Sequence, residues 1–372
     1  MKIAVLAESL DGERRVSATP ETVGKFGKLG ASVAVEAGAG RGAAIPDEAF
    51  AAAGAAVSDR AGALRGAGAI LCVRGPEPDR LAGAAQGALL IGILDPYRRA
   101  DAVRGYAAAG LTAVAMEWVP RITRAQGMDV LSSQANLAGY KAVLDAAAEY
   151  GRAFPMMMTA AGTVSAARVF VMGVGVAGLQ AIATARRLGA VVSATDVRPE
   201  VREQIESLGA KAVFADGLTA SGQGGYAAEL TDAQRAAQAE LVSGHIAKQD
   251  IVVTTALIPG RAAPRLVSDA QLATMRPGSV VVDLAVEQGG NVEGSVAGEV
   301  IERHGVRVVG HRNVPSRLAA DASALYARNL LNFVTAFWKE GALNLPDDDE
   351  IVRGVLLTRG GQVVHERLKA TA

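Results

Sequence analysis

The sequence predicts an α/β protein made of two domains in series, each built on a mostly parallel sheet. Short runs rich in Val, Ile and Ala alternate along the chain with longer helical patterns, which is typical of βαβ units. A second series of such runs begins near residue 168, and 372 residues are enough for two domains with cores of their own. The alternation and the length together therefore favour two α/β domains.

Strand runs occupy the first third of the chain. Five are predicted: residues 2–7, 32–36, 69–73, 88–93 and 112–115. Thr19 followed by Pro20 predicts the start of a helix, because threonine caps a helix and proline fits its first turn. A further helical pattern starts at Pro46.

The second series continues to the C-terminal part of the chain. It holds six predicted strands: residues 168–172, 191–195, 211–214, 251–254, 280–283 and 306–310. Residues 321–339 carry an apolar stripe at helical spacing, and residues 354–359 and 362–365 around Gly360 and Gly361 predict a short hairpin. Because this tail is too short for a domain, we expect it to complete the first one. The predicted organisation is a first domain of residues 1–134 plus 318–372, an inserted second domain of residues 135–317, and a cleft between them.

Composition excludes several classes of function. The 38 basic residues balance 38 acidic ones, so no nucleic-acid-binding or polybasic membrane surface is expected. No run of about 18 uninterrupted apolar residues predicts a membrane span, and MKIAVLAESL lacks the features of a signal peptide. Cys72 is the only cysteine and lies in an apolar run, which predicts an inert buried residue and excludes a disulfide framework or a cysteine-based metal site. We therefore expect a cytoplasmic protein without a metal site.

The strongest chemical signal is ARVFVMGVGVAGLQAIATARRLGA at residues 167–190. Gly173, Gly175 and Gly178 follow a predicted strand and open a predicted helix, in the spacing of a dinucleotide-binding Rossmann domain. The first glycine allows a tight turn, the second lets the backbone approach a pyrophosphate, and the third lets helix and strand pack closely. The phosphates would lie at the helix N-terminus, which favours an anion. Two Rossmann-like domains are therefore predicted, the second binding a dinucleotide; a glycine-rich turn without a ligand is the alternative.

Asp196 ends the second strand of this unit, about 20 residues beyond the glycines. A carboxylate there accepts hydrogen bonds from a ribose diol and repels a 2′-phosphate, so NAD(H) is favoured over NADP(H). Arg198 lies two residues further on and could offset that repulsion. The predicted cofactor-binding residues of this region are Gly173, Val174, Gly175, Val176, Gly178, Asp196, Val197 and Arg198.

Several segments resemble the NAD(H)-binding component of the proton-translocating nicotinamide nucleotide transhydrogenases, a family related to the alanine dehydrogenases. They are GVGVAGLQAIATARRLGA with ATDVR, SGQGGYAAEL, TTALIPG, PGSVVVDLAVEQGGN, NVPSRLAADAS, MEWVP and RITRAQGMDVLSSQANLAGYKAV. The resemblance runs from the N-terminus to about residue 335 and implies the separate soluble α1 subunit of a three-subunit, Si/Re-specific enzyme.

That resemblance also implies a reaction and partners. NADH on this chain would pass a hydride directly to NADP⁺ on a partner subunit, coupled to proton translocation in a membrane component. The chain would be a homodimer that docks the NADP(H)-binding subunit. It would be cytoplasmic and peripheral at the inner face of the cytoplasmic membrane, held there through its partners.

Alanine dehydrogenase remains an alternative, because it shares the architecture. Reductive amination needs a proton donor and acceptor at the substrate, usually His, and residues 1–244 contain no histidine. Where the alanine dehydrogenases carry a His and a Lys, this sequence has Ile93 and Arg74. Hydride transfer between two nicotinamides needs positioning rather than acid–base groups.

A polar segment, RITRAQGMDVLSSQ at residues 121–134, precedes an Ala-rich helix. By resemblance Arg121 and Ser132 position NADH, Gln126 reaches toward NADP(H), and Asp129 holds Arg121 or the carboxamide; these four form the expected catalytic set, and Ser133 joins Arg121, Gln126 and Ser132 in binding the cofactor. A solvated linker between domains is the alternative. For the function of the whole chain, a catalytically silent NAD-sensing module is a further alternative. Such a module would have no reason to keep this polar segment.

A mobile lid is the last expectation near the cofactor. Residues 216–225, DGLTASGQGG, are flexible by composition, and an ordinary surface loop is the alternative. The resemblance implies that this loop closes over NAD(H). It assigns Gly225, Tyr226, Gln238, Ala256 and Leu257 to the cofactor.

Two features carry weaker expectations. Asp283 ends a predicted strand at the carboxyl edge of the sheet, where a nucleotide-side role or a helix cap is expected. Met156, Met157 and Met158 are expected to pack rather than to bind a ligand.

Overall fold

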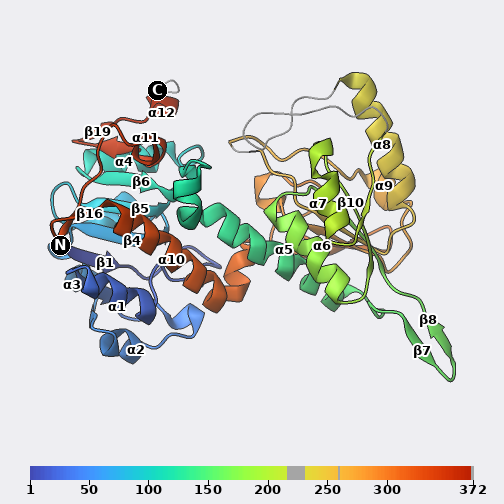
Figure 1. The fold of residues 1–372 in the computed structure, drawn as a ribbon, viewed down its shortest axis with the longest axis horizontal. Helices are drawn as coiled ribbons and strands as arrows, with labels where there is room; N and C mark the ends of the chain where they lie inside the picture. Colours follow the sequence, from blue (N-terminus) through green and yellow to red (C-terminus); the bar gives the residue numbers. More distant parts are fainter. Residues whose placement is uncertain (216–230, 259, 370–372) are drawn as a thin grey trace. The chain divides into compact units, whose positions relative to one another are not determined.

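The structure is a computed structural model that describes residues 1–215, 231–258 and 260–369 (Figure 1). It divides into two compact units: residues 1–134 with 315–372 form unit 1, and residues 135–314 form unit 2. The chain returns to unit 1 at Pro315, three residues before the expected position. The predicted α/β class with parallel sheets is confirmed in both units.

Unit 1 is built on a parallel sheet with the order β3-β2-β1-β4-β5-β6 in the described part of the chain. Its strands are β1 (Lys2–Val5), β2 (Ser32–Glu36), β3 (Ala56–Ser58), β4 (Ala69–Arg74), β5 (Leu89–Ile93) and β6 (Thr112–Ala115). Its helices are α1 (Pro20–Lys28), α2 (Asp47–Ala52), α3 (Arg60–Leu64), α4 (Ala100–Ala108), α10 (Ala319–Phe337), α11 (Glu350–Val355) and α12 (Glu366–Lys369). Thr19 caps α1 with its side chain, as its position before Pro20 predicts.

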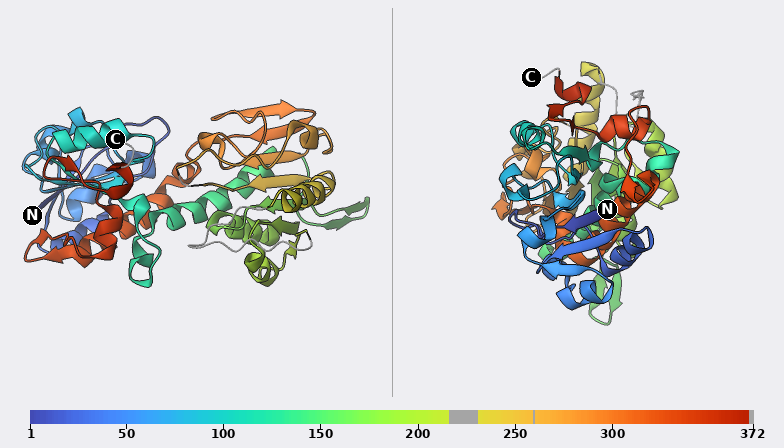
Figure 2. Two further views of the ribbon diagram at one scale, coloured as in Figure 1. Left: turned by 90° about the horizontal axis from the view of Figure 1, so that it is seen from above. Right: turned by 90° about the vertical axis from the view of Figure 1, so that its left-hand side faces the viewer.

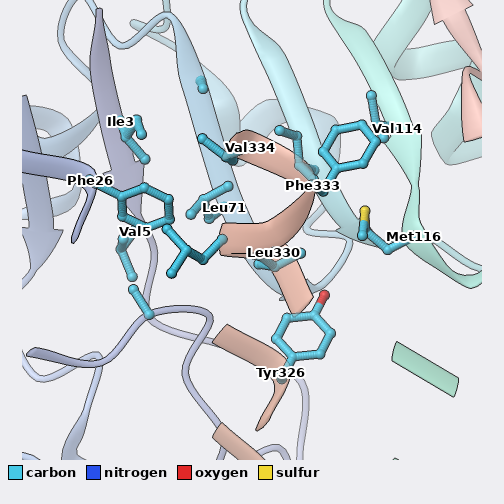
Figure 3. Close-up of a cluster of buried hydrophobic side chains, with 14 of the residues drawn as sticks. Ile3, Val5, Phe26, Leu71, Val114, Met116, Tyr326, Leu330, Phe333 and Val334 are labelled. Atoms are coloured by element: carbon cyan, nitrogen blue, oxygen red, sulfur yellow. The ribbon is translucent and has the colours of Figure 1, made fainter. Parts of the chain in front are cut away.

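Helix α10, in the C-terminal segment, supplies much of the core of unit 1. Tyr326, Leu330 and Phe333 are each 0% exposed and pack with Val5 and Leu71 of the sheet, as Figure 3 shows. Burying side chains of this size contributes roughly 1.5–3 kcal/mol each relative to leaving them in water. The tail is therefore an integral part of unit 1.

Unit 2 holds a second sheet with the order β11-β10-β9-β12-β13-β15-β14 among its described residues. Its strands are β9 (Arg168–Met172), β10 (Val191–Thr195), β11 (Lys211–Ala212), β12 (Ile251–Thr254), β13 (Val280–Asp283), β14 (Val300–Arg303) and β15 (Val306–Val309). The helices are α5 (Val130–Glu149), which begins in unit 1, and α6 (Val176–Arg187), α7 (Arg202–Ser207), α8 (Asp232–Ile246) and α9 (Asp269–Leu272). In both sheets the strand order reverses beside the first strand, which is where open α/β sheets bind ligands.

Some elements differ from the sequence-based expectation. The structure adds the short edge strand β3 and the antiparallel edge strand β14, and residues 354–355 end helix α11 instead of starting a hairpin strand. The hairpin of the tail is limited to β18 (Thr358–Arg359) and β19 (Gln362–Val363). Edge strands of three or four residues are too short for their alternation to be recognised. Cys72 is buried in β4, as expected.

The packing expectation for the three methionines is wrong. Met157 belongs to a hairpin of β7 (Met157–Thr159) and β8 (Gly162–Val164) that extends away from the sheet of unit 2 in Figures 1 and 2. Met156 and Met158 are 64% and 80% exposed. Within the described residues, no helix combines the length and the apolar character needed to span a bilayer.

Candidate nucleotide-binding site

The glycine-rich turn of unit 2 joins β9 to α6 and has the backbone that its sequence predicts. Gly173 has a φ of +97°, a conformation that disfavours other residues. A Cβ on Gly178 would lie 1.9 Å from the Gly173 carbonyl oxygen, so only glycine lets the helix start here. A Cβ on Gly175 would meet no atom within 4 Å, so this side of the turn is open.

The N-terminus of α6 lies beside this open side. Gly175 is its N-cap residue and has no side chain to bond the first N–H groups of the helix. Unpaired N–H groups and the helix dipole favour an anion such as a pyrophosphate. The turn therefore fits a dinucleotide through its backbone, because its open face and its donors are in one place.

Asp196 follows β10 and lies against the same turn. Its Oδ2 accepts a hydrogen bond from the backbone N–H of Val174 at 2.7 Å, and its Oδ1 accepts one from the N–H of Arg198 at 2.9 Å. Burial raises the pKa of Asp196, but the hydrogen bonds from Arg198 and Val174 outweigh it and hold the pKa below its ordinary value. Asp196 is therefore an anion at the place where a ribose is expected.

The end of β12 closes the turn from the other side. The Thr255 hydroxyl donates to the Gly173 carbonyl at 2.9 Å. The Asn291 side chain accepts from the Ala256 N–H at 3.1 Å and donates to the Ala256 carbonyl at 2.9 Å. Leu257, the next residue, is 43% exposed although it is apolar. Asn291 thus fixes the peptide that carries this exposed wall, a role not assigned from the sequence; its only signal was an amide residue in EQGGN.

Asp283 has a different role from the one expected. It is 0% exposed and accepts hydrogen bonds from the N–H groups of Asn291 and Val292 and from the Ser295 hydroxyl. Its carboxylate therefore organises the loop that carries Asn291. A role on the nucleotide would require an exposed carboxylate, and this one is enclosed.

Gln238, on α8, is committed to protein contacts. Its Nε2 donates to the Thr195 hydroxyl at 2.8 Å, and its Oε1 accepts from the Ala215 N–H at 3.1 Å. It therefore supports the end of β10 immediately before Asp196. Gly225 and Tyr226, with the rest of the expected lid, lie outside the described residues.

The polar segment belongs to unit 1, where Arg121 and Gln126 are exposed. Asp129 accepts hydrogen bonds from the N–H and the hydroxyl of Ser132, at 2.9 and 2.5 Å, and so stabilises the first turn of α5. The Ser133 hydroxyl donates to Asn329 of α10 at 2.7 Å. Asp129 and Ser132 thus lie together, and the segment is an ordered short helical turn, Thr123–Met128, followed by a capped helix.

Two buried ionisable side chains of unit 1, Arg15 and His365, are held by contacts within that unit. The buried Arg15 guanidinium is paired with Glu13 at 2.6 Å and donates to Gln134 at 2.8 Å, so this cation is already neutralised. His365 is 8% exposed; its Nδ1 accepts from the Arg367 N–H, and its ring contacts Trp118 in a tilted arrangement. Arg15 and His365 are therefore both engaged in contacts inside unit 1.

Comparison with known proteins identifies the family of the chain. The family model "Alanine dehydrogenase/PNT, N-terminal domain" matches residues 4–138, and "Alanine dehydrogenase/PNT, C-terminal domain" matches residues 142–366. The chain belongs to the alanine dehydrogenase/PNT family. Both predicted Rossmann-like regions are covered by these models.

Within the alanine dehydrogenase/PNT family, the chain is more similar in sequence to the transhydrogenases compared than to the alanine dehydrogenase. It is 51% identical to an NAD(P) transhydrogenase alpha subunit of Rhodospirillum rubrum, over 99% of each chain. A solved transhydrogenase from Sinorhizobium meliloti is 56% identical, covers 98% of this chain and 100% of its own, and superposes with a TM-score of 0.91. Alanine dehydrogenase of Bacillus subtilis is 26% identical over 98% of this chain and 93% of its own. The predicted resemblance to the transhydrogenase alpha subunit is confirmed.

Proposed function

We propose that this chain binds NAD(H) and positions it for direct hydride transfer to NADP⁺ on a partner subunit. The observation that carries the proposal is the turn of unit 2, where an open glycine backbone, an uncapped helix N-terminus and the anionic Asp196 lie together. These are the features that a dinucleotide with a free ribose diol requires. The nicotinamide, when bound, supplies the hydride.

The protein's own residues would bind and orient. The α6 N-terminus would hold the pyrophosphate, and Asp196 would accept from the adenosine ribose. Ala256 and Leu257 would form a wall kept in place by Asn291. Val174, Val176 and Val197 would line the turn.

The residues of the polar segment are part of the same proposal. Arg121 and Ser132 would orient the nicotinamide end of NADH, Gln126 would contact NADP(H) on the partner, and Ser133 would join in binding the cofactor. Asp129 already holds Ser132, and Ser132 would present its hydroxyl through that contact. Support comes from the 51% identity with a transhydrogenase subunit and from the exposure of Arg121 and Gln126.

Partners follow from the reaction. We propose a homodimer that docks an NADP(H)-binding subunit, with proton translocation in a membrane-embedded subunit and Si/Re specificity of transfer. The chain would lie at the cytoplasmic face of the membrane through these partners. Tyr226 and Gly225 would close over bound NAD(H), and Gln238 would anchor the start of that lid.

Transhydrogenation with a purified NADP(H)-binding transhydrogenase component tests the proposal. Hydride transfer from NADH to an NADP⁺ analogue should require both proteins. Gln126→Asn should keep NADH affinity near wild type and lower the transfer rate roughly 100-fold, since a misplacement of about 1 Å can cost that much. Arg121→Ala should weaken both NADH binding and transfer.

Control reactions separate this proposal from its alternatives. The chain alone should not reduce pyruvate with NADH and ammonia between pH 6 and 10, and turnover there would establish alanine dehydrogenase activity instead. NADH binding without any transfer in the presence of the partner component would favour an NAD-sensing module.

A further inference from the structure

The carboxylate of Asp196 is saturated with hydrogen bonds from the protein itself. Besides the N–H groups of Val174 and Arg198, it accepts from the Arg198 guanidinium twice: Nε bonds Oδ1 at 2.9 Å and Nη2 bonds Oδ2 at 3.0 Å. Each oxygen thus accepts two hydrogen bonds, which is the usual capacity of a carboxylate oxygen. Side-chain exposures of 7% for Asp196 and 18% for Arg198 show that the pair is well enclosed.

A ribose diol needs the same two acceptor positions. Two of the four donors are backbone N–H groups fixed by the turn and by the start of the next segment, so they stay in place. The other two belong to the guanidinium fork, which is on a flexible side chain. The two diol hydroxyls can therefore bond Asp196 only by replacing the two guanidinium hydrogen bonds.

We propose that Arg198 is a specificity-determining residue of the NAD(H) site. In the ligand-free chain its guanidinium occupies the position of the ribose diol on Asp196, and the bound diol displaces it. This inference rests on the proposed function, because it presumes that Asp196 receives the adenosine ribose. Arg198 would therefore weaken the binding of NAD(H) and strengthen the binding of NADP(H). It competes with the diol, and after displacement it presents a guanidinium to any 2′-phosphate, for which it is a strong bidentate partner.

Unit 1 contains a matched arrangement without a glycine turn. Glu36 ends β2 and accepts from the Ala7 N–H at 2.9 Å, while Arg60 bonds Glu36 at 3.1 Å and donates to the Ala7 carbonyl at 2.9 Å. Arg198 likewise donates to the carbonyl of Val174, at 3.3 Å. Arg60→Ala is therefore a control that removes an equivalent ion pair far along the sequence from the nucleotide turn.

Calorimetric titration and competition against NADH test the proposal. The ligands are NADH, NADPH and the adenosine-end probes 5′-AMP and 2′,5′-ADP; the proteins are wild type, Arg198→Ala, Arg198→Lys and Arg60→Ala. In Arg198→Ala, NADH and 5′-AMP should bind about two- to fivefold more tightly, because the diol no longer competes with the guanidinium for Asp196. NADPH and 2′,5′-ADP should bind at least about fivefold more weakly, because a charge-assisted bidentate partner is lost.

The two control variants sharpen the result. Arg198→Lys keeps the charge without the fork, so it should retain binding of 2′,5′-ADP while still binding 5′-AMP more tightly. It also provides the decisive measurement if Arg198→Ala does not fold. Arg60→Ala should lower thermal stability and leave all four affinities unchanged.

Contrary outcomes are distinct. Weaker NADH and 5′-AMP binding in both Arg198 variants would show that Arg198 is a direct cofactor ligand or a purely structural partner, and would overturn the inference while the proposed function stands. An unchanged ratio of NADPH to NADH affinity in both variants would overturn it too. If wild type binds neither dinucleotide, the proposed function and this inference both fail.

Discussion

The two units place an acidic residue at the same point of the same sheet order, yet they present different rims. Glu36 at the end of β2 and Asp196 after β10 each bond the N–H of the second residue beyond the first strand, Ala7 and Val174 respectively. Each carboxylate is also paired with an arginine. The acidic residue and its arginine therefore belong to the architecture and do not by themselves indicate a nucleotide site.

What differs is the connection after the first strand. In unit 2 the chain passes from β9 to α6 through three residues, which leaves an open turn and exposed helix donors. In unit 1, residues 6–19 separate β1 from α1, and the Glu8 carboxylate takes the N–H groups of Val73 and Arg74 at 2.7 and 3.1 Å. The N–H groups of Val73 and Arg74 are thus bonded within unit 1. The short glycine turn is therefore the feature that distinguishes this connection of unit 2 from that of unit 1.

The carboxyl groups of the two units also differ in their pKa values. Burial raises the pKa of Glu8 and of Glu117 to about 7, whereas hydrogen bonds outweigh burial and lower the pKa of Asp196. Unit 1 therefore holds two carboxyl groups whose pKa lies near neutral pH. Unit 2 holds the Asp196 carboxylate, an anion that can accept hydrogen bonds from a ligand.

The largest expected effect breaks the turn of unit 2. Gly178→Ala would place a Cβ 1.9 Å from the Gly173 carbonyl, so it should cost about 3 kcal/mol or more in stability and abolish NADH binding. Gly175→Ala meets no protein atom within 4 Å and should fold normally while losing NADH affinity. Thermal unfolding and calorimetry measure both; full NADH affinity in Gly175→Ala would refute the pyrophosphate position.

A second prediction uses the buried acid of unit 1. The folded pKa of Glu117, about 7, lies above its ordinary value of 4.5, so its stabilising contribution is present at low pH and is lost as pH rises through that window. Glu117→Gln cannot ionise, so its stability relative to wild type should rise between pH 4.5 and 8 by roughly 2–3 kcal/mol. Urea unfolding at several pH values measures this difference. A difference independent of pH would contradict the raised pKa.

The smallest expected effect compares the paired acids. Asp196→Ala removes the ribose acceptor and the charge that repels a 2′-phosphate, so the ratio of NADPH to NADH dissociation constants should fall about tenfold, or about 1.4 kcal/mol. Glu36→Ala should lower stability and leave that ratio unchanged. Equal shifts in the two variants would mean that neither acid contacts the ribose.

Local chemistry was readable from the sequence. The ends of β9, β10, β12 and β13 coincide with the predicted strands, because most residues of each run are buried and are apolar or β-branched. The glycine turn was also predictable, since its backbone depends on residues within six positions of one another. The expected lid lies outside the described residues, so it stays a prediction.

The sequence by itself thus determined the parallel sheets, the glycine turn and the acid that follows the second strand, because period and spacing encode them locally. The tertiary structure alone decided which polar groups are committed: Asn291 to Ala256, Ser133 to Asn329, and the guanidinium of Arg198 to Asp196. The first two contacts join residues 35 and 196 positions apart in the chain, and no local pattern specifies such pairs. Arg198 was close enough in sequence to be noticed, but whether its side chain faced solvent, a phosphate or the carboxylate depended on the folded geometry of the turn.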